Sequence, residues 1–297
     1  MEKLIIDDTA QQKITSFSIS DSNKIFELPL IKLGGPYFFK AKLNRKKVKV
    51  MIDFGDNGVL GLFPYSVIKS KASLIKKDAI GVGVDTMNIK LGILDKMNIK
   101  NGPVIRKIPF YMRPTDFTVK LFGFIPIFRS EACVGLGFLS KFNIITLDMP
   151  DKKIILNEIP QNVIHNSETI EIPCSFDKNN KQIKINGIID EINCDFILDL
   201  SGTQTAITLY GETAKKVMQY NSFEEIGKIS SFGRSGDKLY KSKVKYVKMG
   251  NYEQKNIEIF LIPDNPQNGG IIGDNFWGLS TIGIDFNKNK MYYLLKK

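Results

Sequence analysis

Two acidic residues are candidates for chemistry because each ends an apolar run and precedes a turn of small residues. Asp53 follows residues 50–52 and precedes Gly55, and Asp199 follows residues 196–198 in the second half of the chain. Two carboxylates held a few ångströms apart share one proton, so one can activate a water while the other protonates a carbonyl oxygen. The pair therefore predicts hydrolysis of a peptide bond by water.

The sequence around each acid is followed by further motifs that also occur twice. They are an apolar-apolar-Gly element, a Leu/Ile-Asp pair, and a mostly apolar stretch that ends in proline, once at Pro114 and once at Pro263. The offset between the two copies is nearly the same for all of these motifs, and a repeat of this length indicates a duplicated domain rather than a solenoid. The matched segments are 133–135 with 271–273, 147–148 with 284–285, and 108–114 with 257–263.

The local patterns predict a mainly β protein. Residues 37–43 and 47–52 alternate apolar and charged side chains, which is typical of strands. Residues 64–69 begin with proline and predict a short helix, and residues 210–218 predict another at the matching place. We expect an N-terminal extension or added edge strand over 1–24, a first lobe over 25–160 and a second lobe over 168–297. The polar stretch 158–168 separates the lobes.

Composition excludes several classes of protein. The 297 residues carry 42 Lys and Arg against 31 Asp and Glu, for a net charge of +11. Because lysines are scattered and arginine is scarce, we expect no nucleic-acid partner. No segment is apolar enough to span a membrane. The first residues carry acids where a secretory signal has an apolar core, so we expect either a cytoplasmic protein or one exported with its leader removed.

The single histidine, His165, lies in the polar stretch between the lobes, so Ser-His-Asp, Cys-His and His-Cys zinc sites are excluded. We expect neither a metal nor a cofactor. Cys133 lies in an apolar run and is expected to be buried. Cys174 and Cys194 fall on successive predicted strands; free thiols are favoured, and a disulfide is the alternative in an oxidising compartment.

These motifs resemble the retropepsin-like aspartic proteases, the clan of retroviral and pepsin-type enzymes, and are most similar to bacterial two-repeat members. The resemblance rests on the two aspartate turns, on residues 134–139 and 271–276, and on Asp148 and Asp285. It spans about residues 25–295. It implies two pseudo-twofold-related acid-protease lobes in one chain, a cleft between them, and a monomer that is an intramolecular pseudo-dimer.

The resemblance also implies the roles of individual residues. Asp53 and Asp199 correspond to the catalytic aspartates of an endopeptidase that binds an extended peptide or protein substrate. Glycine-rich stretches near Gly83 and Gly233 correspond to flap hairpins that cover this substrate. The residues expected to contact substrate from the active-site loops and flaps are Gly55, Ser201, Gly202, Gly83, Val84, Gly233 and Arg234.

The sequence departs from the family pattern at the aspartate turns. Phe54 and Leu200 replace the hydroxyl residues that link the two loops, so we expect apolar packing to hold these loops. Ser201 stands where glycine is usual and could crowd the site. Asp56 adds a third acid, whose charge would raise the proton affinity of the pair.

These departures favour a catalytically inactive, peptide-binding relative as the main alternative to the peptidase. A structural component without a cleft is a third class, and two turn residues without any paired role are the simplest interpretation of Asp53 and Asp199. The tripeptide 53–55 also spells the metal-binding motif of protein kinases, but the chain lacks the His-Arg-Asp loop that this function requires. Residues 81–83 and 135–137 lack the third glycine of a dinucleotide site.

Overall fold

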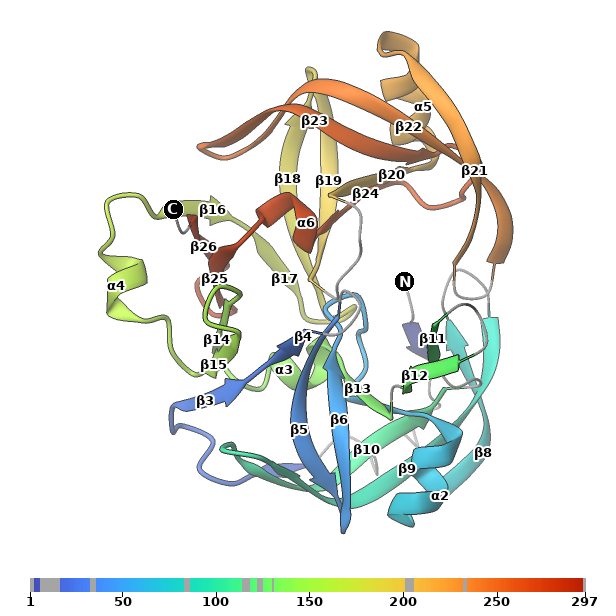
Figure 1. Cartoon of the computed structure of the whole chain (residues 1–297), viewed down its shortest axis with the longest axis vertical. Coiled ribbons are helices and arrows are strands. Elements are labelled where there is room, and N and C mark those ends of the chain that lie inside the picture. The colour runs from blue at the N-terminus through green and yellow to red at the C-terminus, as the bar shows by residue number, and fades with distance from the viewer. Residues whose placement is uncertain are drawn as a thin grey trace.

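The computed structural model describes residues 3–5, 17–32, 36–82, 86–113, 118–121, 125–129, 131–200, 206–231 and 234–295. The chain is mainly β and forms two similar lobes, one above the other in Figure 1, each built on a closed barrel of six strands. This confirms the expected fold class of two related lobes in one chain. The proposed domain boundaries stay predictions.

The two barrels have the same strand order. The first runs β13-β6-β5-β9-β10-β7 and closes where β7 pairs with β13; the second runs β24-β19-β18-β22-β23-β20 and closes where β20 pairs with β24. The first barrel contains β5 (Tyr37–Leu43), β6 (Lys46–Ile52), β7 (Leu60–Leu62), β9 (Thr86–Ile99), β10 (Val104–Met112) and β13 (Ala132–Val134). The second contains β18 (Gln182–Ile189), β19 (Ile192–Asp199), β20 (Ile207–Tyr210), β22 (Arg234–Met249), β23 (Tyr252–Ile262) and β24 (Gly269–Gly273).

A sheet of six strands joins the lobes, and its register carries the pseudo-twofold symmetry. Its order is β16 (Ile170–Pro173), β26 (Lys290–Leu295), β25 (Ser280–Asp285), β14 (Ile144–Asp148), β15 (Lys153–Leu156) and β3 (Phe26–Pro29). In the central pair of strands, Ile144 faces Asp285 and Asp148 faces Thr281. Ile144 and Thr281 are related by the same sequence offset as Asp148 and Asp285. The pseudo-twofold rotation therefore exchanges the pair Ile144–Asp285 with the pair Thr281–Asp148. The axis therefore passes through the pair midway between them, Thr146 and Gly283.

The repeated acids Asp148 and Asp285 have a structural role in this sheet. Asp148 Oδ1 accepts a hydrogen bond from the amide of Asp151 at 3.1 Å, and Asp285 Oδ1 accepts one from the amide of Asn287 at 3.0 Å. A short acidic side chain that bonds to the following backbone is a common device for closing a turn. The second repeated motif therefore serves the hairpins of the fold.

Both predicted helices are present. They are α2 (Pro64–Ser70), which ends at Lys71 with a left-handed φ of 53°, and α5 (Gly211–Tyr220). One-turn helices follow the apolar-apolar-Gly elements in both lobes: α3 (Leu136–Leu139) after β13 and α6 (Asp274–Trp277) after β24. The remaining short elements are α4 (Gln161–Ile164), β4 (Ile31–Lys32) and β17 (Ser175–Asp177).

A long hairpin rises from each lobe at the places expected for flaps. In the first lobe β8 (Ser73–Val82) pairs with β9, and in the second β21 (Phe223–Ser231) pairs with β22. The two hairpins lie on the same side of the molecule, at the right of Figure 1. Their tips, including Gly83, Val84 and Gly233, lie outside the described residues.

The described parts of the N-terminal segment add two edge strands. Strand β1 (Lys3–Ile5) pairs with β8, and β2 (Ser18–Ile19) pairs with β10. Between β10 and β13 the first lobe also has a separate two-stranded hairpin, β11 (Thr118–Leu121) with β12 (Ile125–Arg129). In the second lobe only residues 263–268 join the corresponding strands, so this hairpin is specific to the first lobe.

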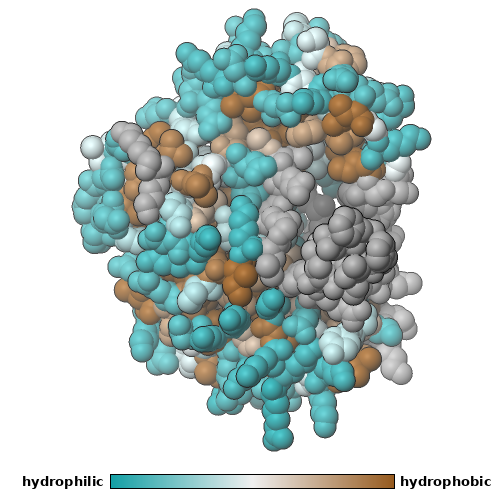
Figure 2. Space-filling model, viewed as in Figure 1, coloured by the Kyte–Doolittle hydropathy of each residue, from teal (hydrophilic) through white to brown (hydrophobic). Residues whose placement is uncertain are grey.

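One apolar core runs through both lobes. Phe54 and Leu200, the residues after the two candidate acids, are fully buried in it, which confirms that apolar packing holds these turns. All three cysteines are free, as favoured from the sequence, and Cys133 is fully buried. Hydrophilic residues cover most of the described surface in Figure 2, and no described helix is long and apolar enough to cross a membrane.

Candidate functional site

Asp53 is held at the end of β6 by the parallel strand β13. Its amide donates to the carbonyl of Val134 at 3.0 Å, and its Oδ1 accepts a hydrogen bond from the amide of Gly55 at 3.1 Å. The side chain is half-buried, with 16% exposed. The apolar run before Asp53 thus forms a central barrel strand, and the turn after it leaves the carboxylate partly accessible.

Asp199 is the last residue of β19, where it pairs in parallel register with Gly273 of β24. Its carboxylate lies against the first lobe, because a Cβ placed on Gly55 would fall 2.8 Å from Asp199 Oδ2. Gly55 therefore contacts the carboxylates of both candidate acids. Asp199 thus lies beside the turn that follows Asp53, while the pairing of the two carboxylates and its catalytic role stay predictions.

The other predicted substrate contacts are placed only in part. Ser201, Gly202, Gly83, Val84 and Gly233 lie outside the described residues, and Arg234 is the first residue of β22, opposite Ser231. Near Asp199, burial and then the charge of Asp199 raise the pKa of Tyr210 to about 12. Tyr210 is therefore neutral at ordinary pH.

Arg113 is the central residue that the sequence interpretation missed. It follows β10, and its Nη2 lies 3.3 Å from Asp53 Oδ2 and 3.0 Å from Asp56 Oδ2. The same nitrogen lies 3.1 Å from the hydroxyl of Tyr111. The guanidinium also packs over the rings of Phe63 and Tyr111, at 5.7 and 5.8 Å from their centroids. A half-buried cation thus bridges two of the acids.

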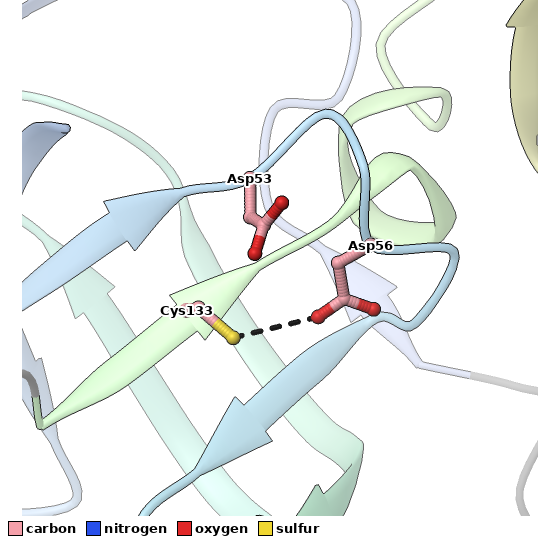
Figure 3. Close-up of side chains that lie close together, drawn as sticks. All are labelled: Asp53, Asp56 and Cys133. Carbon is pink, nitrogen blue, oxygen red and sulfur yellow. Dashed lines mark hydrogen bonds between the residues drawn. The ribbon is translucent and has the colours of Figure 1, made fainter. Parts of the chain in front are cut away.

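Asp56 completes a dense polar cluster with Arg113. Its Oδ1 accepts from the amide of Gly58 at 2.7 Å, and its Oδ2 accepts from the hydroxyl of Tyr111 and from Cys133 Sγ, the latter at 3.4 Å. Figure 3 shows Asp56 and Cys133 facing each other below Asp53. Asp56 is therefore a third acid near Asp53, as the sequence showed, and the guanidinium of Arg113 offsets its charge.

Burial and charge act in opposite directions on Arg113. Burial opposes its charge, but the acidic groups around it, Cys133, Tyr111, Asp56 and Asp53, raise its pKa well above the ordinary value. Burial raises the pKa of Cys133 well above its usual range, so this thiol stays protonated. The cluster therefore holds one permanent cation against the carboxylates.

Among the described residues, the second lobe has no counterpart of this cluster. Tyr111 and Cys133 both pair with Gly61, while in the second lobe Phe260 and Ile271 both pair with Thr208. Arg113 lies two residues after Tyr111, and Ile262 lies two residues after Phe260, so Arg113 corresponds to Ile262. The signal that could have revealed this site was therefore a charged residue where the repeat has isoleucine.

Asp53, Asp56 and Cys133 each offer an atom that could bind a metal, all within 4.8 Å of one another. A carboxylate-thiolate set of this kind could in principle suit zinc. However, Arg113 already contacts both carboxylates, and the thiol of Cys133 is protonated. These residues fit an internal ion-pair network better than a metal.

Comparisons with known proteins support the fold alone. No family model matches the chain, and no curated protein is similar to it. Basic 7S globulin from soybean has a similar structure, with a TM-score of 0.52, 10% identity, and coverage of 92% of this chain and 95% of that chain. Conglutin gamma, a basic 7S globulin from lupine seeds, has a TM-score of 0.56, 10% identity, and coverage of 93% and 96%.

The resemblance to bacterial retropepsin-like proteases is therefore wrong as a family assignment. Two of the similar structures are globulins, from soybean and from lupine seeds, and no family model supports a retropepsin. The physical reason is that the repeated motifs serve the two-barrel fold itself. Apolar-apolar-Asp turns and apolar-apolar-Gly elements form its paired parallel strands, so they mark this architecture without marking the chemistry. The bacterial and hydrolase assignments have no support from these comparisons.

Proposed function

We propose that this chain is a non-catalytic protein that binds an extended peptide between its two lobes. The observation that carries this proposal is the ion pair of Arg113 with Asp53, at 3.3 Å, and with Asp56, at 3.0 Å. A hydrolytic pair needs a carboxylate that can take a proton from water. At Asp53 one oxygen accepts from Gly55 and the other contacts the guanidinium.

The guanidinium opposes hydrolysis in two ways. A neighbouring cation stabilises the charged form of a carboxylate, which makes that carboxylate a weaker base. It also breaks the equivalence of the two acids, because Arg113 corresponds to the apolar Ile262 in the second lobe. The two structural neighbours are named as globulins rather than as enzymes, which favours the same interpretation.

Peptide binding is supported by the arrangement of the lobes. Gly55 of the first lobe and Asp199 of the second meet at one place, and each lobe contributes a long hairpin on the same side of the molecule. An extended peptide between such hairpins would gain main-chain hydrogen bonds, with side-chain pockets providing selectivity. The net charge of +11 favours an acidic peptide.

The test is direct binding of labelled peptides. Fluorescent decapeptides of random sequence, one pool rich in Asp and Glu and a matched pool rich in Lys and Arg, would be titrated against the protein at pH 7 and followed by anisotropy. We expect saturable binding of the acidic pool without any loss of peptide mass. The variant Gly55→Leu should abolish binding because its side chain would enter the space beside Asp199.

The matched control is Glu212→Leu, since Glu212 is an exposed residue of α5 in the second lobe. It should bind as the wild type does. Failure of both pools to bind, or equal binding by Gly55→Leu in a folded state verified by circular dichroism, would reject a peptide site between the lobes.

The second candidate function is an acid endopeptidase that uses Asp53 and Asp199. It is favoured by the contact of Asp199 with Gly55, whose amide also binds Asp53. Digestion of denatured casein between pH 3 and 7 tests it, with Asp53→Asn and Asp199→Asn as controls and a statine-containing peptide as inhibitor. Cleavage that both substitutions abolish would replace our first proposal. Absence of cleavage, or cleavage that neither substitution changes, would eliminate the endopeptidase.

A further inference from the structure

The two lobes differ at one barrel edge. In the first lobe the N-terminal strand β2 pairs antiparallel with β10, so that Ile19 faces Ile105. The amide of Ser20 donates to the carbonyl of Val104 at 2.8 Å, and the amide of Val104 donates to Ser20 Oγ at 2.9 Å. An extended segment of the chain thus occupies the outer edge of β10.

A side chain of this segment covers the aromatic residue of the adjacent one-turn helix. The ring of Phe17, just before β2, stacks on Phe138 of α3 with centroids 6.4 Å apart. Stacked aromatic pairs of this kind add about 0.5–1.5 kcal/mol to the burial of apolar area. The first lobe therefore shows how this barrel edge binds an extended segment with an aromatic side chain.

The equivalent edge in the second lobe belongs to β23. Val104 pairs with Asn98 at the start of β10, and Glu253 pairs with Lys248 at the corresponding place in β23. The other edge of β23 pairs with β20 only from Phe260 to Ile262. Among the described residues, no strand pairs with that edge between Tyr252 and Ile257. It is an open template for another strand.

Beside this open edge is a recess of about 660 Å³. Phe276 lies in it, three residues after Gly273, as Phe138 lies three residues after Gly135. Tyr252 stacks on Trp277 at 5.8 Å, and Trp277 lies 5.3 Å from Tyr293. Trp277 Nε1 is buried without a hydrogen-bond partner among the described residues. The recess is thus lined by a packed aromatic cluster, one member of which has a buried donor without a partner among the described residues.

We infer that this recess, together with the open edge of β23, binds an extended segment of a partner protein that presents an aromatic side chain. The backbone of the segment pairs with β23 at Glu253, and its aromatic ring lies against the cluster of Tyr252, Phe276 and Trp277. This is strand addition at a sheet edge, in which backbone bonds give affinity and the side-chain recess gives selectivity.

Charge complementarity defines the partner further. Among the described residues, those that line the recess include two acids, Glu168 and Glu253, and no lysine or arginine; Glu253 Oε1 lies 3.5 Å from Lys255 Nζ, outside the lining. In a chain of net charge +11 this lining carries acids rather than bases, which favours a segment with a lysine or arginine near its aromatic residue. The inference concerns a site on the second lobe and is independent of the peptide site proposed between the lobes.

The test uses Trp277, the only tryptophan of the chain, as the reporter. The first probe is a nonapeptide with the sequence of residues 15–23, extended by one lysine at each end; the second has alanine in place of its phenylalanine. We expect a saturable change in tryptophan emission with the first probe and at least tenfold weaker binding of the second. If the peptide instead displaced β2 from the first lobe, the emission of Trp277 would stay unchanged. That result would overturn the inference.

Two changes test the backbone pairing. Glu253→Pro removes the amide that corresponds to the Val104 amide, which binds Ser20 in the first lobe, and should weaken binding at least tenfold. Its matched control Glu253→Gln keeps the amide and should bind within about threefold of the wild type. A peptide N-methylated at the amide equivalent to Ser20 tests the same bond with unaltered protein. Equal binding of the methylated and unmethylated peptides, or a wild-type dimer in sedimentation equilibrium that the peptide dissociates, would overturn the inference.

Discussion

Asp199 of the second lobe lies against Gly55 of the first, so closely that a Cβ on Gly55 would fall 2.8 Å from Asp199 Oδ2 and 3.1 Å from its Cγ. Gly55 in turn donates its amide to Asp53. The two halves of a duplicated sequence therefore meet at their aspartate turns, and a glycine is required where they meet.

Gly55→Ala should destabilise the protein. The added methyl group must displace the Asp199 carboxylate or the turn, and overpacking of this kind costs about 1–3 kcal/mol. The measurement is chemical denaturation at pH 7. The double variant Gly55→Ala/Asp199→Ala removes the atoms that clash, so most of the loss should be recovered relative to Asp199→Ala alone. If the loss of unfolding free energy in the double variant equals the sum of the losses in the two single variants, this contact is absent in solution.

Arg113→Met should be strongly destabilising at neutral pH. It leaves the carboxylates of Asp53 and Asp56 together with no cation between them, and breaking such a buried pair costs about 3–5 kcal/mol. Arg106→Met is the control, since Arg106 is an exposed arginine of β10. Equal effects of the two substitutions at pH 7 would contradict the ion pair.

Tyr210 should make stability depend on alkaline pH. Burial, with a contribution from Asp199, raises its pKa to about 12, whereas a tyrosine in the unfolded chain titrates near 10. Below pH 10 the hydroxyl is protonated in both states and stability does not depend on it. Above pH 10 it ionises first in the unfolded chain, so the unfolding free energy falls, by about 3 kcal/mol in all once the pH has passed 12. The difference in unfolding free energy between wild type and Tyr210→Phe should fall across this range. A difference that stays constant from pH 9 to 12 would refute the shift.

The three thiols should be unreactive in the folded protein. Burial is the main cause that raises the pKa of Cys174 and of Cys194 to about 12, and it also raises that of Cys133. At pH 8 the thiolate fraction at a pKa near 12 is about 10⁻⁴. Iodoacetamide should leave the native protein unmodified and label three cysteines after denaturation, as mass spectrometry would detect. Rapid native labelling of Cys174, the least buried thiol, would contradict this.

Much of the local structure followed from residue patterns. The alternation over residues 37–43 predicted β5, the proline at residue 64 predicted the start of α2, and the regular repeat predicted two related lobes. These features depend on neighbours within a few residues, where periodicity and turn chemistry decide conformation. The family assignment failed because the same repeated motifs serve the strands of the fold, whatever its chemistry.

The order of residues along the chain determined the duplication, the strands and the position of each acid at the end of a strand. The tertiary structure decided which groups surround those acids. Arg113 and Asp53 are far apart in the sequence, and only the arrangement of β10 and β6 in one closed barrel brings a cation to this carboxylate. The open edge of β23 could not be predicted from the sequence either. It is recognised only by comparison with the first lobe, where β2 pairs with the equivalent edge of β10.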